Sequence, residues 1–186
     1  MLRYGHGRMV PEAPLELNDV GGLYPAGEGW FVVNVRDAQW FDATPLGLYA
    51  PFEGEHARFS QLGVNIGVLR PGEPSCMYHA EDAQEDFLVL AGECLLVVEG
   101  QERSLKQWDF VHCPPLTRHV FVGAGDGPCV LLGIGARRSG RALVYPVEDA
   151  ALRHGAGVET ETTDPAEADA RFPRARVAPC PETFTA

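Results

Sequence analysis

Three side chains with the chemistry of metal ligands lie close together in the middle of the chain, namely His79, Glu81 and Glu85. Residues two apart on a β-strand point to the same face, so His79 and Glu81 are expected to share a face. Residues 82–84 are short enough to reverse the chain as a hairpin loop, which would place Glu85 on the returning strand. If the two faces coincide, the imidazole and the two carboxylates converge inside a β-structure.

The segments around these residues show the alternation typical of short β-strands. The pattern is clearest at residues 62–69, where large apolar side chains alternate with glycine and asparagine. Further strands are expected at residues 30–36, 46–52, 94–98, 103–105, 108–113, 118–122, 129–134 and 141–145. The chain contains 21 glycines and 15 prolines, a composition that suits many tight turns. We therefore predict an all-β fold, a closed sandwich or barrel.

The sequence divides into three expected parts. Residues 1–29 are rich in turn residues and predict an N-terminal arm with room for one short strand. Residues 30–146 hold the strands of the expected barrel. Residues 147–186 predict a C-terminal helical and irregular tail, because capping residues favour short helices at 147–154 and from 165 to about 172. The last residues contain several prolines and little to bury, so we expect a loose end.

Composition argues against several classes of function. A chain of 186 residues with a net charge of −11 favours one domain that repels phosphate backbones, so we expect no nucleic-acid partner. No apolar stretch approaches membrane length and no secretion signal begins the chain, so we expect no membrane association and a cytoplasmic location. Five cysteines without a C-x-x-C pair indicate buried thiols in a reducing compartment rather than a disulfide framework.

A second histidine, His119, lies two residues before Phe121 in an expected strand, so the two side chains should point to the same face. An imidazole on such an apolar face is costly to bury unless its nitrogens are satisfied. With this residue, the chain resembles the cupin family over roughly residues 30–145. The family's first motif has the form G-x5-H-x-H-x3-4-E-x6-G, and the corresponding residues here are Gly72, His79, Glu81, Glu85 and Gly92.

Both motifs depart from the family pattern in places. In the first motif, one extra residue follows the glycine, and Glu81 replaces the second histidine. The second motif, P-x-G-x2-H-x3-N, matches at Pro114 and His119. Leu116 and Gly123 stand where glycine and asparagine are usual. The resemblance implies a double-stranded β-helix, the cupin or jelly-roll barrel, with a metal held by His79, Glu85 and His119 and a further role for Glu81.

The chemistry of these residues supports a metal site independently. Two histidines and one carboxylate leave coordination positions open and suit non-haem iron or manganese, while zinc and nickel stay possible. If Glu81 also binds, its oxygen favours harder ions such as Mn²⁺ or Fe²⁺. If Glu81 stays unbound, it lies beside a Lewis acid and can act as a catalytic general base. The competing interpretation is that His79, Glu85 and His119 are satisfied polar side chains in a barrel without metal.

The expected function is therefore that of a metal-binding cupin that acts on a small organic molecule in its barrel. Oxygenase, decarboxylase and isomerase chemistry all fit, with a slight preference for a neutral or enol-type substrate. The alternative is a non-enzymatic cupin that binds a small ligand and holds a structural metal. The resemblance also suggests a homodimer in which the arm exchanges strands. The residues expected to line the pocket are Met77, Phe87, Val89 and Phe121.

Overall fold

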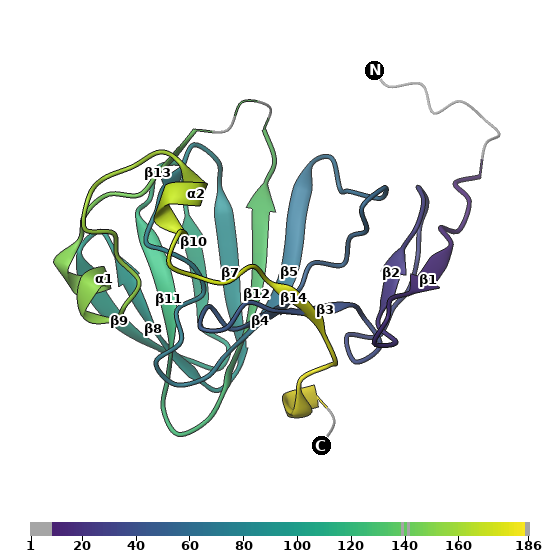
Figure 1. Cartoon of the computed structure of the whole chain (residues 1–186), viewed down its shortest axis with the longest axis horizontal. Helices are drawn as coiled ribbons and strands as arrows, with labels where there is room; N and C mark the ends of the chain where they lie inside the picture. Colours follow the sequence, from purple (N-terminus) through teal and green to yellow (C-terminus); the bar gives the residue numbers. More distant parts are fainter. Residues whose placement is uncertain (1–8, 139, 141, 185–186) are drawn as a thin grey trace.

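A computed structural model describes residues 9–138, 140 and 142–184 of the chain (Figure 1). The strands are β1 (Leu15–Leu17), β2 (Leu23–Pro25), β3 (Trp40–Asp42), β4 (Leu48–Ala50), β5 (Leu62–Leu69), β6 (Ala80–Glu81), β7 (Glu85–Ala91), β8 (Glu93–Val98), β9 (Gln101–Lys106), β10 (Phe110–Cys113), β11 (His119–Ala124), β12 (Cys129–Ala136), β13 (Leu143–Val144) and β14 (Arg176–Ala178). The helices are α1 (Asp149–Arg153), α2 (Pro165–Ala168) and the 3-10 helix η1 (Glu182–Phe184). The predicted all-β class with short C-terminal helices is confirmed.

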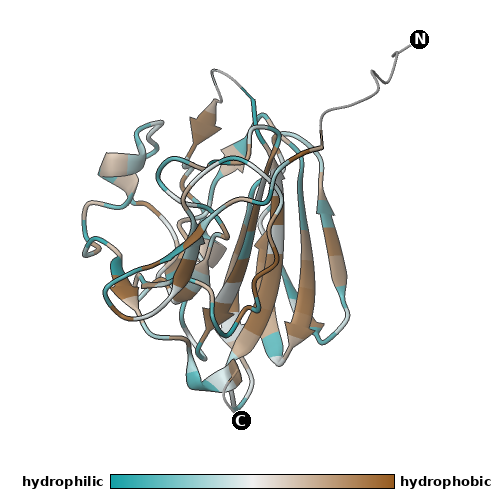
Figure 2. Cartoon of the chain, turned by 90° about the vertical axis from the view of Figure 1, so that its right-hand side faces the viewer, coloured by the Kyte–Doolittle hydropathy of each residue, from teal (hydrophilic) through white to brown (hydrophobic). Residues whose placement is uncertain are grey.

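The strands form two main antiparallel sheets that face each other across a core. One sheet has seven strands in the order β10-β7-β12-β5-β4-β3-β14, and the other has three in the order β11-β8-β9. Strands of both sheets supply the same apolar cluster, which includes Leu69, Val89, Leu96, Phe121 and Leu131. Figure 2 shows that apolar residues dominate the strands, whereas hydrophilic residues are concentrated in the connecting loops. This arrangement is the predicted double-stranded barrel.

The alternation in residues 62–69 reflects burial on both faces of β5. Ile66 and Val68 point outward, where they pack in a second apolar layer around Trp40. Gly67 and Leu69 point inward and line the barrel cavity. Because Gly67 has no side chain, space remains inside the barrel at this point of the strand.

The expected hairpin between His79 and Glu85 is wrong. β6 pairs with β13, while β7 pairs with β10 and β12 in the seven-stranded sheet. Residues 82–84 therefore carry the chain from one sheet to another instead of joining neighbouring strands. The alternation of side chains along a strand determines which face each side chain occupies. It does not determine which strand pairs with it, because that depends on long-range packing.

The N-terminal part contains strands β1 and β2, whereas the strand expected at residues 30–36 is not formed. Residues 30–36 form no strand, apart from an isolated bridge between Glu12 and Trp30. Val33 and Val35 pack instead on the apolar layer of Trp40, whose Nε1 donates to the Val35 carbonyl at 2.9 Å. β1 and β2 pair as a hairpin at the opposite end of the molecule from α1 (Figure 1).

The expectation of a loose C-terminal end is also wrong. β14 pairs with β3 at the edge of the seven-stranded sheet. Farther on, the ring of Phe184 lies 5.3 Å from that of Trp40 between ring centroids. Trp40 is fully buried, so a segment with few apolar residues still anchors on the core. Among the described helices, none has the length and apolar character needed to cross a membrane.

This contact predicts a measurable role for the C-terminal segment. Phe184→Ala removes a partly buried aromatic ring from the Trp40 layer. We expect it to lower the free energy of unfolding by about 1–2 kcal/mol, less than for a fully buried ring. Denaturant titration would measure the change. Thr183→Ala is the matched control, because Thr183 is exposed and should leave the stability unchanged within about 0.5 kcal/mol. Equal midpoints for the two variants would contradict the anchoring role.

Candidate metal centre

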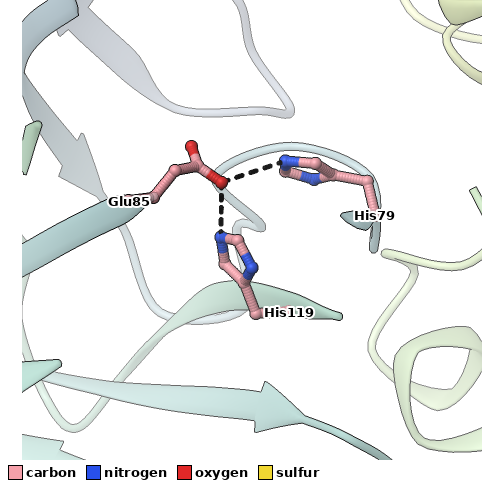
Figure 3. Close-up of side chains that lie close together, drawn as sticks. All are labelled: His79, Glu85 and His119. Atoms are coloured by element: carbon pink, nitrogen blue, oxygen red, sulfur yellow. Dashed lines mark ion pairs between the residues drawn. The ribbon is translucent and has the colours of Figure 1, made fainter. Parts of the chain in front are cut away.

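Three predicted ligands meet inside the barrel although they come from separate segments (Figure 3). His79 precedes β6, Glu85 begins β7 and His119 begins β11. Oε2 of Glu85 lies 3.8 Å from Nε2 of His79 and 3.4 Å from Nε2 of His119. One ligand atom from each residue lies within 4.8 Å of the other two. The spatial convergence expected for His79, Glu85 and His119 is therefore present.

Backbone pairing places the two imidazoles side by side. His79 and His119 form an antiparallel bridge, in which the N–H of each donates to the carbonyl of the other at 3.2 and 2.9 Å. Residues directly opposite in such a pair project to the same face, and these ring centroids lie 5.0 Å apart. Glu85 reaches the rings from the opposite sheet. Its register partner on β12 is Gly135. A Cβ added at Gly135 would lie 3.7 Å from the Glu85 side chain, so the backbone of β12 does not crowd this glutamate.

The outer nitrogen of each ring is held by the backbone. Nδ1 of His79 donates to the Met77 carbonyl at 2.8 Å, and Nδ1 of His119 donates to the Thr117 carbonyl at 3.0 Å. A hydrogen on Nδ1 leaves the lone pair of a neutral ring on Nε2, which in both rings faces Glu85. Backbone carbonyls orient metal-binding histidines in this way, so the tautomers and directions suit an ion.

The spacing also fits a shared ion. Ligands about 2.1 Å from a metal lie roughly 3.0 Å apart at a right angle and about 4.2 Å apart on opposite sides. The observed separations of 3.4 and 3.8 Å fall within this interval. His79, Glu85 and His119 therefore fit a divalent metal ion as a two-histidine, one-carboxylate set, which leaves coordination positions for other groups.

The two histidines differ in their affinity for protons. Burial alone lowers the pKa of His79, but the Cys76 sulfur, the Met77 carbonyl and the Glu85 carboxylate favour the charged ring and raise its pKa to about 9. Burial and the neighbouring charge of His79 lower the pKa of His119 to about 4, against a small opposing effect of a backbone carbonyl. At neutral pH the metal-free protein therefore carries one charged and one neutral imidazole.

Metal binding should consequently release a proton. Near pH 7 His79 is protonated and His119 is not, because their pKa values are about 9 and about 4. Both rings must be neutral to bind, so we expect about one proton released per ion near pH 7. Calorimetric titration in buffers of different ionisation enthalpy measures this number. At about pH 10 the histidines should release none, and a metal that binds near pH 7 without proton release would contradict the assignment.

The candidate ligands face a cavity of about 230 Å³. Phe87 and Phe121 line it as predicted. Met77 and Val89 do not: Met77 packs against Tyr145 and Val158, and Val89 lies in the apolar core. The complete lining is Leu46, Leu48, Tyr49, Asn65, Gly67, Leu69, Ser75, Cys76, His79, Glu85, Phe87, His119, Phe121, Leu131 and Gly133.

Glu81 lies near the site but outside the group of three. It is 4% exposed, and its backbone carbonyl accepts from the N–H of Leu116 at 2.7 Å. Among the described residues, its carboxylate belongs neither to the three-ligand group nor to the cavity lining. Its role as ligand or general base stays a prediction. His112, another histidine near the second motif, instead pairs with Asp86 at 2.6 Å.

Sequence reasoning missed several polar groups of the cavity. Tyr49, Asn65, Ser75 and Cys76 all line it. Cys76 Sγ lies 3.6 Å from Nδ1 of His79 and 3.5 Å from the Ser75 hydroxyl. Asn65 alternates with glycines on the inner face of β5, a signal that was visible in the sequence. Nothing in the sequence links Tyr49 to the cavity, because β4 joins β5 only through long-range pairing.

Part of the chain is similar to known proteins. Residues 65–135 match the family model described as a cupin domain. A sugar phosphate isomerase from a cupin superfamily, from Silicibacter pomeroyi, is 25% identical with a TM-score of 0.50, over 58% of this chain and 74% of that chain. A putative sugar phosphate isomerase from Acidithiobacillus ferrooxidans is 24% identical with a TM-score of 0.48, over 53% of this chain and 65% of that chain.

A third solved structure is less similar to this chain. An rmlc-like cupin family protein with a double-stranded β-helix fold, from Methanocaldococcus jannaschii, is 18% identical with a TM-score of 0.40. The similarity covers 43% of this chain and 73% of that chain. No curated protein is similar enough in sequence to count as a relative.

Proposed function

Because the chain is a member of the cupin superfamily, we propose that its barrel holds a divalent metal ion on His79, Glu85 and His119 and acts on a small organic molecule beside it. The observation that carries this proposal is the direction of the two imidazoles. Both Nε2 atoms face the Glu85 carboxylate, while both Nδ1 atoms are held by backbone carbonyls. Such a set leaves open coordination positions next to the cavity, whereas a structural site is usually closed.

The cavity lining supports an uncharged reacting group. Apolar side chains such as Leu69, Phe87, Phe121 and Leu131 form much of the wall. Within the described lining there is no lysine or arginine. A phosphate dianion buried there would lack a protein cation, although a neighbour in structure is named a sugar phosphate isomerase. We therefore infer that the reacting end of the substrate is an enol, a diketone or a similar neutral oxygen group.

The chain's own residues orient the reaction and keep water away. When bound, the ion supplies Lewis-acid chemistry or dioxygen activation. The backbone carbonyls fix both imidazole planes, and Glu85 neutralises part of the ion's charge. Phe87 and Phe121 exclude water from the reacting end, which strengthens electrostatic interactions there. Glu81 remains our candidate for a fourth ligand or for the base that moves a substrate proton.

We also propose a cytoplasmic location, a homodimer and a division of the chain into three parts. The five cysteines are free, which supports a cytoplasmic location. Exposed apolar side chains of the N-terminal part support a homodimer, and they include Met9, Val10, Trp30 and Val32. We retain the division into an arm (1–29), a barrel (30–146) and a tail (147–186) as part of the proposal.

Metal analysis followed by turnover assays tests the proposal. We expect about one ion per chain, and turnover of at least one member of a panel of enols and diketones. Oxygen uptake would identify oxygenase chemistry, loss of carbon dioxide would identify a decarboxylase, and solvent deuterium incorporation would identify an isomerase. A metal-loaded protein inert to every member, with no exchangeable water on the ion, would favour the non-enzymatic alternative with a structural metal.

A further inference from the structure

A second hollow lies beside the inner cavity. This hollow, called the vestibule below, has a volume of about 540 Å³. Leu46, Tyr49 and Ser75 line both spaces, so the two lie next to each other. The remaining vestibule residues are Ala43, Ala166, Asp169, Ala170, Phe172, Pro173, Arg174 and Ala175. The outer wall therefore comes mainly from the C-terminal segment between α2 and β14.

That segment is fixed to the barrel. Figure 1 shows the chain crossing the barrel between α2 and β14. The ring of Phe172 packs against the buried cluster of Met77 and Tyr145. The guanidinium of Arg171 lies 4.8 Å from the centroid of the Phe172 ring and donates to the carbonyls of Gly155 and Gly157 at 2.6 and 3.3 Å. The vestibule thus has a built wall on the side facing solvent.

Charge differs between the two spaces. The inner lining has no lysine or arginine among the described residues, whereas Arg174 lines the vestibule. Within the described part of the chain, the Arg174 guanidinium has no hydrogen-bond or ion-pair partner, unlike Arg137 and Arg153, which pair with glutamates. The other charged vestibule residue is Asp169, so the lining carries one guanidinium and one carboxyl group.

The structure assigns to the vestibule a binding site for a carboxylate at the far end of the substrate, recognised by Arg174. The substrate class is then a monocarboxylic acid whose neutral oxygen-bearing end reaches the inner cavity. A single carboxylate matches a guanidinium well. Tyr49 and Ser75 line both spaces, so the middle of such a molecule would pass beside them. This inference rests on the proposed function. It assigns a place to a charged end of the substrate, which the inner cavity cannot hold.

Calorimetric binding to the metal-loaded protein tests the assignment with two probes. One is acetylacetone extended at one end by a carboxymethyl group, and the other is the methyl ester of the same acid. The probes share the chelating diketone and differ in charge. We expect the acid to bind about fivefold more tightly than the ester, because one exposed ion pair contributes up to about 1 kcal/mol. Arg174→Gln should remove this preference and leave the affinity for the ester unchanged.

Arg176→Gln is the matched control, since Arg176 is exposed, lies two residues away and lines neither space. It should keep the preference for the acid. Equal binding of acid and ester by the unmodified protein, or a preference that survives Arg174→Gln, would overturn the assignment while leaving the metal site intact. Failure of both probes to bind a metal-loaded protein would instead refute the proposed function, and the assignment with it.

Discussion

Replacing His119 by alanine is expected to lower the affinity of the protein for its metal by at least about a hundredfold. The imidazole is one of three candidate ligands, and even the partners that orient metal ligands affect affinity by about 10–100-fold. His119 is 2% exposed, so water enters the vacated position only with difficulty. Competition with a chromophoric chelator would measure the affinity directly.

The matched control is His112→Ala. His112 lies on β10 seven positions earlier and pairs with Asp86 outside the three-ligand group. It should leave the affinity for metal unchanged within about twofold. His119→Gln supports the comparison, because it retains polar volume in the buried position. Circular dichroism should show the same strand signal for all variants. A folded His119→Ala or His119→Gln protein with unchanged affinity would remove His119 from the site.

Filling the inner cavity should prevent ligand binding without releasing the metal. Gly67 lines the cavity, and an added Cβ there would meet nothing closer than 3.9 Å. Gly67→Val therefore projects its methyl groups into free space, and its β-branched side chain suits a strand. We expect the affinity for acetylacetone to fall at least about tenfold, a loss comparable with the cost of overpacking a core. Metal content should remain at about one ion per chain.

Gly67→Ala provides the control for this experiment. Its single methyl group makes ordinary van der Waals contact with the carbonyls of Leu48 and Leu131, each 3.9 Å away. The affinity for acetylacetone should change by less than about threefold. If Gly67→Val binds acetylacetone as tightly as the unmodified protein, the ligand site lies elsewhere. Loss of metal in Gly67→Val would show that the two parts of the site are not separable.

Local patterns predicted much of the barrel. Residues 62–69 alternate between a small and a large side chain, and β5 occupies that range. The expected strands at 94–98, 118–122 and 129–134 correspond to β8, β11 and β12. The expected cap residue Asp164 accepts a hydrogen bond from the first turn of α2. These features depend on residues near one another in the chain, which is why the sequence reveals them.

Three predictions failed where distant partners decide the structure. Residues 30–36 have strand composition but form no strand, and only Val33 and Val35 of this segment pack on the Trp40 layer. The turn at 82–84 joins two sheets, because β6 and β7 find partners far along the chain. The C-terminal end is held by β3 and by one aromatic contact, which composition alone does not reveal.

In the candidate site, too, local patterns predicted some features, whereas long-range contacts decide the others. Motif spacing identified His79, Glu85 and His119, and their convergence depends on the bridge between the two histidines. The expectation that Met77 lines the pocket failed, since the chain is not regularly extended there. The vestibule escaped prediction because much of its wall comes from residues 166–175, far along the chain from the first motif, which ends at Gly92.

Anomalous diffraction from crystals of the metal-loaded protein, measured at the absorption edge of the bound metal, tests the central claim most directly. We predict one strong peak about 2.0–2.4 Å from Nε2 of His79, Nε2 of His119 and a carboxylate oxygen of Glu85. A peak at another place, with Glu85 still in direct contact with both imidazoles, would contradict the account.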